Sequence, residues 1–123
     1  MTMKIGVSVK GKNNDSLLDV RFGRCEYFQI HDTDTGEIKV VENEAKSASG
    51  GAGIAASNQL INENVDVIIT GNLGPNAFGL IKKEGIKAYK CESMAVSLAL
   101  EKYNNGELQE ITMSGPAHHG GSK

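Results

Sequence analysis

The sequence is poor in aromatic and disulfide-forming residues. Of its 123 residues none is tryptophan, only 5% are aromatic and only two are cysteine. So few aromatic side chains argue against a surface on which nucleic-acid bases would stack. Cys25 and Cys91 lie far apart and form no Cys-x-x-Cys motif, so we expect free thiols in a reducing compartment rather than a disulfide.

Long apolar runs and a strong net charge are missing too. No segment approaches the roughly 20 apolar residues that a membrane-spanning helix needs, and residues 1–10 lack the apolar core of a signal peptide. We therefore predict a cytoplasmic protein that binds neither membrane nor nucleic acid. The net charge of −2 gives no global attraction to polyanions, so any bound anion must be held by local geometry.

What the sequence does contain is a regular alternation of apolar segments with glycine-rich turns. We predict a single α/β domain over residues 1–113 and a flexible tail over residues 114–123. Period-two or β-branched apolar patterns predict strands at 3–9, 27–32, 38–43, 65–70 and 86–91, with a short extended piece as an option at 108–113. Apolar stripes predict helices at 54–64, from Pro75 to a stop at Gly85, and at 94–103 with Ser93 as its N-cap.

The order β-β-β-α-β-α-β-α predicts a mixed five-stranded sheet with one antiparallel strand and three helices. The later strand–helix alternation requires right-handed parallel crossovers. If strands 3–9 and 65–70 are neighbours, the strand order reverses between them, and ligands in open α/β sheets bind at such a reversal. Loops 10–15, 71–75 and 91–93 would then lie at one edge of the sheet, together with the start of the first helix.

The segment KSASGGAGIAASNQLI crowds three glycines into the entry of the first predicted helix. Helix N-termini present unpaired N–H groups that hold anions, and glycine leaves room for a bulky ligand. We therefore predict an anion cradle built from the two glycine-bearing helix entries. Its candidate residues are Arg24, Gly50, Gly51, Gly53, Gly71, Asn72, Gly74 and Asn76. The alternative is that these glycines only form turns and a close-packing point.

A dinucleotide-binding loop is the other interpretation of this segment. Residues 51–56 match the pattern G-x-G-x-x-G/A. They follow a polar loop rather than a strand, however, and no acidic residue stands at the end of the strand at 65–70 to bind a ribose. The match is therefore weak, and the sequence contains no P-loop motif.

The thiols and imidazoles are the candidate metal ligands. Cys25 lies beside arginines that would acidify its thiol, and Cys91 precedes a helix whose dipole would favour the thiolate. Either thiol could equally be a buried packing residue. His31 is either an ordinary strand residue or a ligand. His118 and His119 either donate imidazoles to a metal or belong to a disordered end.

Four segments together resemble the dinitrogenase iron–molybdenum cofactor biosynthesis family: RFGRCEYFQIHD, SASGGAGIAASNQLI, VDVIITGNLGPNAF and GIKAYK. The resemblance covers residues 3 to about 110. It implies a ribonuclease H-like fold and the binding, carriage or assembly of an anionic metal–sulfur cluster. The family's Phe-Gly-Arg falls on residues 22–24 and its Gly-Pro-Asn-Ala turn on residues 74–77. The cysteine at position 25 departs from the small residue that is common there.

We accordingly expect a non-enzymatic carrier that holds an iron–sulfur or iron–molybdenum-type cluster transiently. Two cysteines are fewer than the about four thiolates of a permanently bound cluster. The expected partners are cluster donor and acceptor proteins, and the expected state is a monomer or weak dimer. The alternatives are a regulatory or adaptor domain that binds a nucleotide or a protein at the same edge, and a small enzyme acting on a phosphorylated metabolite. Nuclease activity is not expected, because the first strand offers no carboxylate for a two-metal site.

Overall fold

The computed structural model describes residues 3–48 and 50–114. Its strands are β1 (Lys4–Val9), β2 (Tyr27–Asp32), β3 (Ile38–Glu42), β4 (Val67–Thr70), β5 (Lys87–Lys90) and β6 (Gln109–Glu110). Its helices are α1 (Ala52–Asn62), α2 (Pro75–Lys83) and α3 (Val96–Asn104), with a short 3-10 turn η1 (Phe22–Arg24) between β1 and β2. No helix in these ranges is long and apolar enough to cross a membrane.

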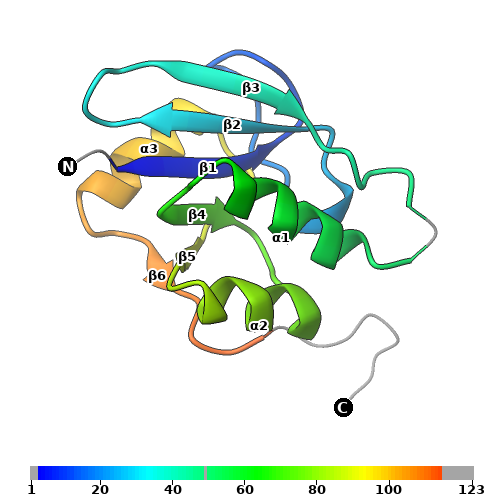
Figure 1. Cartoon of the computed structure of the whole chain (residues 1–123). Helices are drawn as coiled ribbons and strands as arrows, with labels where there is room; N and C mark the ends of the chain where they lie inside the picture. The colour runs from blue at the N-terminus through cyan, green and yellow to red at the C-terminus, as the bar shows by residue number, and fades with distance from the viewer. Residues whose placement is uncertain (1–2, 49, 115–123) are drawn as a thin grey trace.

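The strands form one six-stranded mixed sheet in the order β3-β2-β1-β4-β5-β6. Helices α1 and α2 cover one face and α3 covers the other (Figure 1). Strands β1, β4 and β5 run parallel, whereas β2 and β6 run against their neighbours. The predicted three-helix α/β fold is confirmed. The predicted count of five strands with one antiparallel member is wrong, because residues 109–110 pair with β5 as a sixth strand.

The pairing of β1 with β4 confirms that strand order reverses between them. Ile5 lies opposite Val67 and Val7 opposite Ile69 in a parallel ladder. From β1 the chain adds β2 and β3 on one side, and from β4 it adds β5 and β6 on the other. The carboxyl ends of β1, β4 and β5 therefore meet at one edge of the sheet, at the right of Figure 1.

Strand β1 shows why the sheet has a layer on each face. Ile5, Val7 and Val9 are buried in the apolar cluster beneath α3. Gly6 points to the opposite face, where an added Cβ would lie 3.4 Å from Val65 Cγ1 and 3.5 Å from Leu60 Cδ1. The small residue thus lets α1 pack close to the sheet, as the alternation in the sequence predicts.

Glycine and proline mark the helix ends except at the start of α3, and Gly106 at φ 72° follows the end of that helix. Gly51 is the N-cap of α1 at φ 70°, in the left-handed region that favours glycine. Pro75 begins α2, and Gly85 at φ 77° follows its end. Ser93 does not cap α3, contrary to expectation: its Oγ donates to the Leu18 carbonyl at 3.2 Å, and α3 begins three residues later, at Val96.

Candidate functional site

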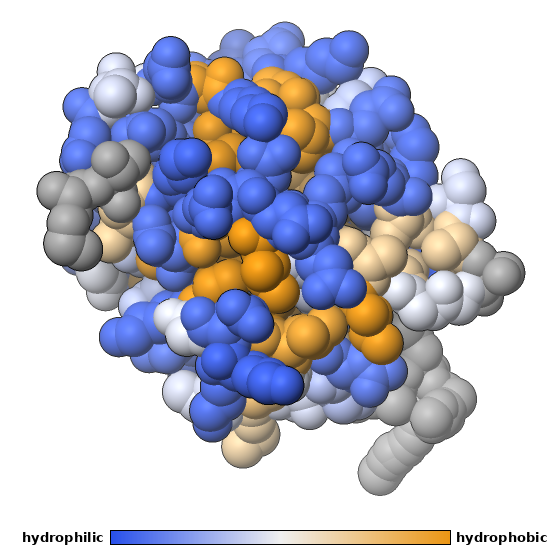
Figure 2. Space-filling model, in the orientation of Figure 1, coloured by the Kyte–Doolittle hydropathy of each residue, from blue (hydrophilic) through white to orange (hydrophobic). Residues whose placement is uncertain are grey.

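The two glycine-bearing helix entries lie side by side at the carboxyl edge of the sheet. A Cβ built on Gly53, in the first turn of α1, would lie 3.4 Å from the Cβ of Ala77 in the first turn of α2. We call this edge the rim and define it as residues 20–24, 50–53 and 71–76. In Figure 2 the right-hand side, where α1 begins, is white to pale orange, which marks residues of intermediate hydropathy.

Three rim glycines are open to a ligand. A Cβ on Gly50, Gly51 or Gly74 would meet no described atom within 4 Å. Gly51 and Gly74 are the N-caps of α1 and α2, and neither helix has a side-chain cap. The N–H groups of both first turns therefore have no side-chain partner, apart from Pro75, which has no N–H, and that of Gly53 lies against Gly23. This arrangement can hold an anion.

Gly71 is not open, which corrects its assignment to the cradle. A Cβ there would lie 2.3 Å from the Cβ and 2.6 Å from the Cα of Val20. Gly23 is packed in the same way, since its Cβ would lie 3.0 Å from the backbone nitrogen of Gly53. At these two positions the close-packing alternative holds. Residues 20–24 therefore contact the turn after β4 through Val20 and the first turn of α1 through Gly23.

Asn72 and Asn76 have exposed positions on the rim. Asn72 forms an isolated parallel bridge with Arg21, which joins residues 20–24 to the turn after β4. Asn76 lies in the first turn of α2. Both amides therefore lie beside the helix entries, and their part in binding a ligand stays a prediction.

Arg24 fixes the loop before α1. Its Nη1 donates to the carbonyl of Ala48 at 2.6 Å and to that of Lys46 at 3.3 Å. The side chain is exposed, so the remaining guanidinium N–H groups still face solvent at the rim. Arg24 thus shapes the approach to the first helix entry as well as adding positive charge.

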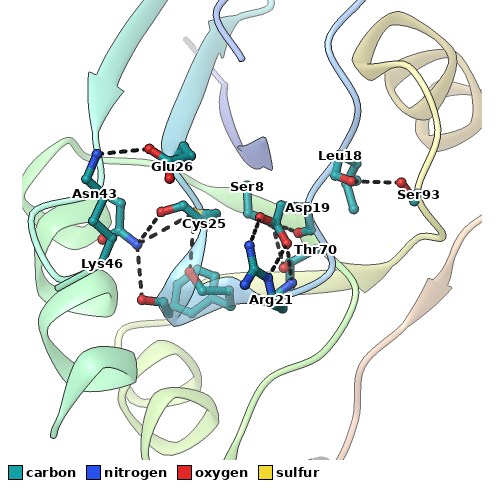
Figure 3. A network of polar contacts seen from close by, with 12 residues as sticks. Ser8, Leu18, Asp19, Arg21, Cys25, Glu26, Asn43, Lys46, Thr70 and Ser93 are labelled. Atoms are coloured by element: carbon teal, nitrogen blue, oxygen red, sulfur yellow. Dashed lines mark hydrogen bonds and ion pairs between the residues drawn. The ribbon is translucent and has the colours of Figure 1, made fainter. Parts of the chain in front are cut away.

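Arg21 and Asp19 form an ion pair that the candidate set from the sequence does not contain. Arg21 Nη2 lies 2.9 Å from Asp19 Oδ2, and Arg21 Nε lies 3.1 Å from Oδ1 (Figure 3). The Arg21 backbone N–H also donates to Oδ1, at 2.9 Å. The Arg21 side chain is 62% exposed and that of Asp19 is 1% exposed. The only trace in the sequence is an acid two residues before an arginine.

Asp19 is tied to the point where strand order reverses. Its backbone N–H donates to the Ser8 carbonyl at 2.8 Å, and its carbonyl accepts from Ser8 Oγ at 2.6 Å. Ser8 Oγ lies 2.7 Å from Thr70 Oγ1, and because its single proton goes to Asp19, Thr70 is the donor. Burial raises the pKa of Asp19, but the hydrogen bonds from Arg21 outweigh it and hold that pKa below its ordinary value. The carboxylate is therefore ionised at neutral pH.

Both thiols are buried, and the prediction that they are acidified is wrong. Burial, with a contribution from Asp19, raises the pKa of Cys25 to about 12. Its Sγ donates to the Phe22 carbonyl at 3.4 Å. Cys91 lies in the apolar cluster beneath α3, where burial raises its pKa.

The candidate metal ligands are not brought together. His31 lies opposite Ile5 and Ile38, at the end of the sheet away from the rim. Its Nε2 is 2.9 Å from Gln29 Oε1, and burial lowers the pKa of the imidazole. His118 and His119 lie outside the described residues. Within residues 3–48 and 50–114, no group of three or more His, Cys, Asp or Glu side chains is arranged to hold a metal ion.

Comparisons with known proteins agree with this fold. A family model described as "Dinitrogenase iron-molybdenum cofactor" matches residues 3–106. An uncharacterized protein of Methanocaldococcus jannaschii is 32% identical over 112 residues, which span 89% of this chain and 92% of that protein.

Two solved structures are similar along nearly their whole length. The apo form of the orange protein from Desulfovibrio gigas has a TM-score of 0.88 at 32% identity, covering 92% of this chain and 96% of its own. The NMR structure of a Thermotoga protein assigned to the DUF35 family has a TM-score of 0.81 at 34% identity, covering 92% and 97%.

Proposed function

Because the chain belongs to the dinitrogenase iron–molybdenum cofactor family, we propose that it binds and carries an anionic metal–sulfur cluster at the rim. The observation that carries the proposal is the closeness of the two uncapped helix entries: a Cβ built on Gly53 would lie 3.4 Å from the Cβ of Ala77. One helix N-terminus attracts an anion weakly, whereas two that open onto one place can donate to the same guest.

The strength of binding expected from this arrangement suits a carrier. A hydrogen bond to a charged group contributes about 1.5–3 kcal/mol, and association costs at least about 4 kcal/mol in lost freedom of motion. Four or five such bonds therefore give a net free energy of at most about 2–11 kcal/mol, a range that includes micromolar affinity at about 8 kcal/mol. A cluster held at this strength can be passed on, in contrast to one fixed by several thiolates.

The buried thiols support the same inference. Cys25 and Cys91 are 0% and 4% exposed, and burial raises the pKa of both. We infer that the described part of the rim holds its guest by charge and hydrogen bonds, with the cluster keeping its own sulfide shell. A contribution of His118 or His119 stays a prediction.

We further propose that the protein is a carrier or assembly factor rather than an enzyme. It would work in the cytoplasm between a donor and an acceptor of the cluster, as a monomer or a weak dimer. Iron–molybdenum-type and iron–sulfur clusters both meet the charge requirement of the rim. A ribonuclease H-like classification of the fold remains an expectation from the family resemblance.

A pair of substitutions at Gly74 tests the function. Position 74 is open, exposed and the N-cap of α2, so both Asp and Asn should fit it and cap the helix equally well. The two variants then differ only by one negative charge at the rim. The probe is tetrathiomolybdate, a metal–sulfide dianion, titrated anaerobically and followed by its visible absorbance and by equilibrium dialysis.

We expect the native protein to bind the probe, Gly74→Asn to bind it somewhat more weakly because its side chain takes one N–H donor of α2, and Gly74→Asp to bind at least about tenfold more weakly than Gly74→Asn. The reason is the repulsion between a carboxylate and a dianion a few ångströms apart, about 1–3 kcal/mol at an intermediate dielectric constant. If the native protein fails to retain the probe, or if the two variants bind equally, the rim is not the anion site. Binding of a nucleotide but not of the probe would favour the adaptor alternative.

A further inference from the structure

We propose, on the basis of the proposed function, that Arg21 recognises the charge of the guest and that Asp19 is the positioning residue that aims Arg21 at it. The proposal depends on where residues 20–24 lie. Val20 covers Gly71 and the Arg21 backbone is bridged to Asn72, whereas Gly23 is packed on the first turn of α1. Arg21 is therefore held on a segment that contacts both helix entries.

The pairing with Asp19 leaves one side of the guanidinium free. An arginine has five N–H donors in a fixed plane. Asp19 takes Nε and one N–H of Nη2, at 3.1 and 2.9 Å. In residues 3–48 and 50–114 the other three donors have no acceptor, and the side chain is 62% exposed. These three donors are a planar set suited to the edge of an anion.

Asp19 is a rigid anchor because every part of it is engaged. The carboxylate accepts three hydrogen bonds from Arg21, and the backbone is bonded to Ser8 through both its N–H and its carbonyl. Ser8 in turn accepts from Thr70, so the anchor joins β1 to β4 at the strand reversal. An exposed ion pair usually holds its partners loosely. Here one partner is 1% exposed, so the guanidinium has little freedom to turn.

The substitution Asp19→Asn changes the binding affinity in opposite directions if Asp19 acts only through its charge and if it orients Arg21. Asp19 neutralises part of the charge of Arg21 as well as orienting it. If charge alone governs binding, Asp19→Asn adds one net positive charge at the rim and tightens the binding of an anion. If orientation governs binding, the same substitution releases the guanidinium and weakens binding in spite of the added charge. The direction of the change therefore separates the two.

The experiment measures the anaerobic dissociation constant of tetrathiomolybdate for the full chain and its variants at pH 7. We expect Arg21→Gln to weaken binding about tenfold or more, and Arg21→Lys to weaken it less, since lysine keeps the charge without the fork. Asp19→Asn should weaken it several-fold. The control is Lys39→Gln, which removes a lysine of equal exposure, 62%, paired with Glu63 at the far end of the sheet, and should change binding less than twofold.

Each outcome decides one point. If Asp19→Asn binds as tightly as the native protein or more tightly, Asp19 does not position Arg21. If the native protein binds the probe and Arg21→Gln binds equally well, Arg21 does not recognise the guest while the proposed function stands. Should the native protein itself bind nothing, both proposals fail. If Asp19→Asn does not fold by circular dichroism, Asp19→Glu decides: it keeps the charge but shifts the carboxylate, and unchanged binding would overturn the positioning role.

Discussion

The structure predicts that replacing Gly71 by alanine destabilises the protein, whereas replacing Gly79 by alanine stabilises it. A Cβ at Gly71 would lie 2.3 Å from the Cβ of Val20, where ordinary contacts are 3.4–4 Å. A displacement of more than about 1 Å is needed, and Val20 cannot move freely. Its neighbour Asp19 is bonded to Ser8 and Arg21, and its neighbour Arg21 is bridged to the turn after β4.

The expected change in the free energy of unfolding comes from overpacking at Gly71 and from helix propensity at Gly79. Overpacking of a filled site costs about 1–3 kcal/mol, and the backbone contact at Gly71 favours the upper half of that range. In a chain of this size, about 2–3 kcal/mol lowers the midpoint of thermal unfolding by roughly 8 °C or more. Gly79 lies inside α2, is exposed, and would present its Cβ to open space. Alanine there should stabilise the helix by about 1 kcal/mol and raise the midpoint by a few degrees.

The assay is thermal and urea unfolding followed by circular dichroism at 222 nm, on Gly71→Ala and Gly79→Ala side by side. Gly79→Ala controls for the loss of backbone freedom that every glycine-to-alanine change brings to the unfolded chain. If Gly71→Ala is as stable as the native protein, or if both variants shift in the same direction, the close packing of residues 20–24 against the turn after β4 is refuted.

Two further predictions concern titratable side chains. The pKa of Cys25 is raised to about 12 from an ordinary value of 9.0, so its thiolate fraction at pH 8 is about a thousandfold lower than in the unfolded chain. Neither Cys25 nor Cys91 should therefore react with a thiol reagent until urea unfolds the protein. Rapid labelling of the native protein would contradict the burial of the thiols. Burial lowers the pKa of His31 below 6.5, so the unfolded state binds the extra proton and stability should fall as pH drops through about 6.5. His31→Gln should remove part of that fall in urea midpoints measured between pH 7.5 and 5.5, and an unchanged pH dependence would show that the imidazole titrates equally in both states.

Local patterns in the sequence predicted the fold well where burial is periodic. The alternation of Ile5, Val7 and Val9 and the continuous apolar run of β4 identify central strands, and Pro75 and Gly85 bound α2. These patterns are predictive because the burial or backbone conformation of each residue follows from its position within its own strand or helix.

Features that depend on partners distant in the chain could not be predicted in this way. Strand β6 has two residues, too few for a period, and exists only through its pairing with β5. Ser93 has the chemistry of an N-cap, but contact with Leu18 redirects its hydroxyl.

In the candidate site too, local features were predictable and those that depend on distant residues were not. The glycine entries were identified, yet nothing local distinguishes Gly74, which is open, from Gly71, which Val20 covers. The pairing of Arg21 with Asp19 was missed because a nearby acid and base in a loop are usually both solvated, and only burial makes this pair rigid. The acidity of the thiols could not be predicted because burial, which raises the pKa of Cys25 and Cys91, depends on residues distant in the chain.

Residues 20–24 touch the turn after β4 at one end and the first turn of α1 at the other. They fasten the turn that leads into α2 to the first turn of α1, so a shift of either one strains the other. The relative placing of the two helix starts is therefore set by a segment that belongs to neither helix.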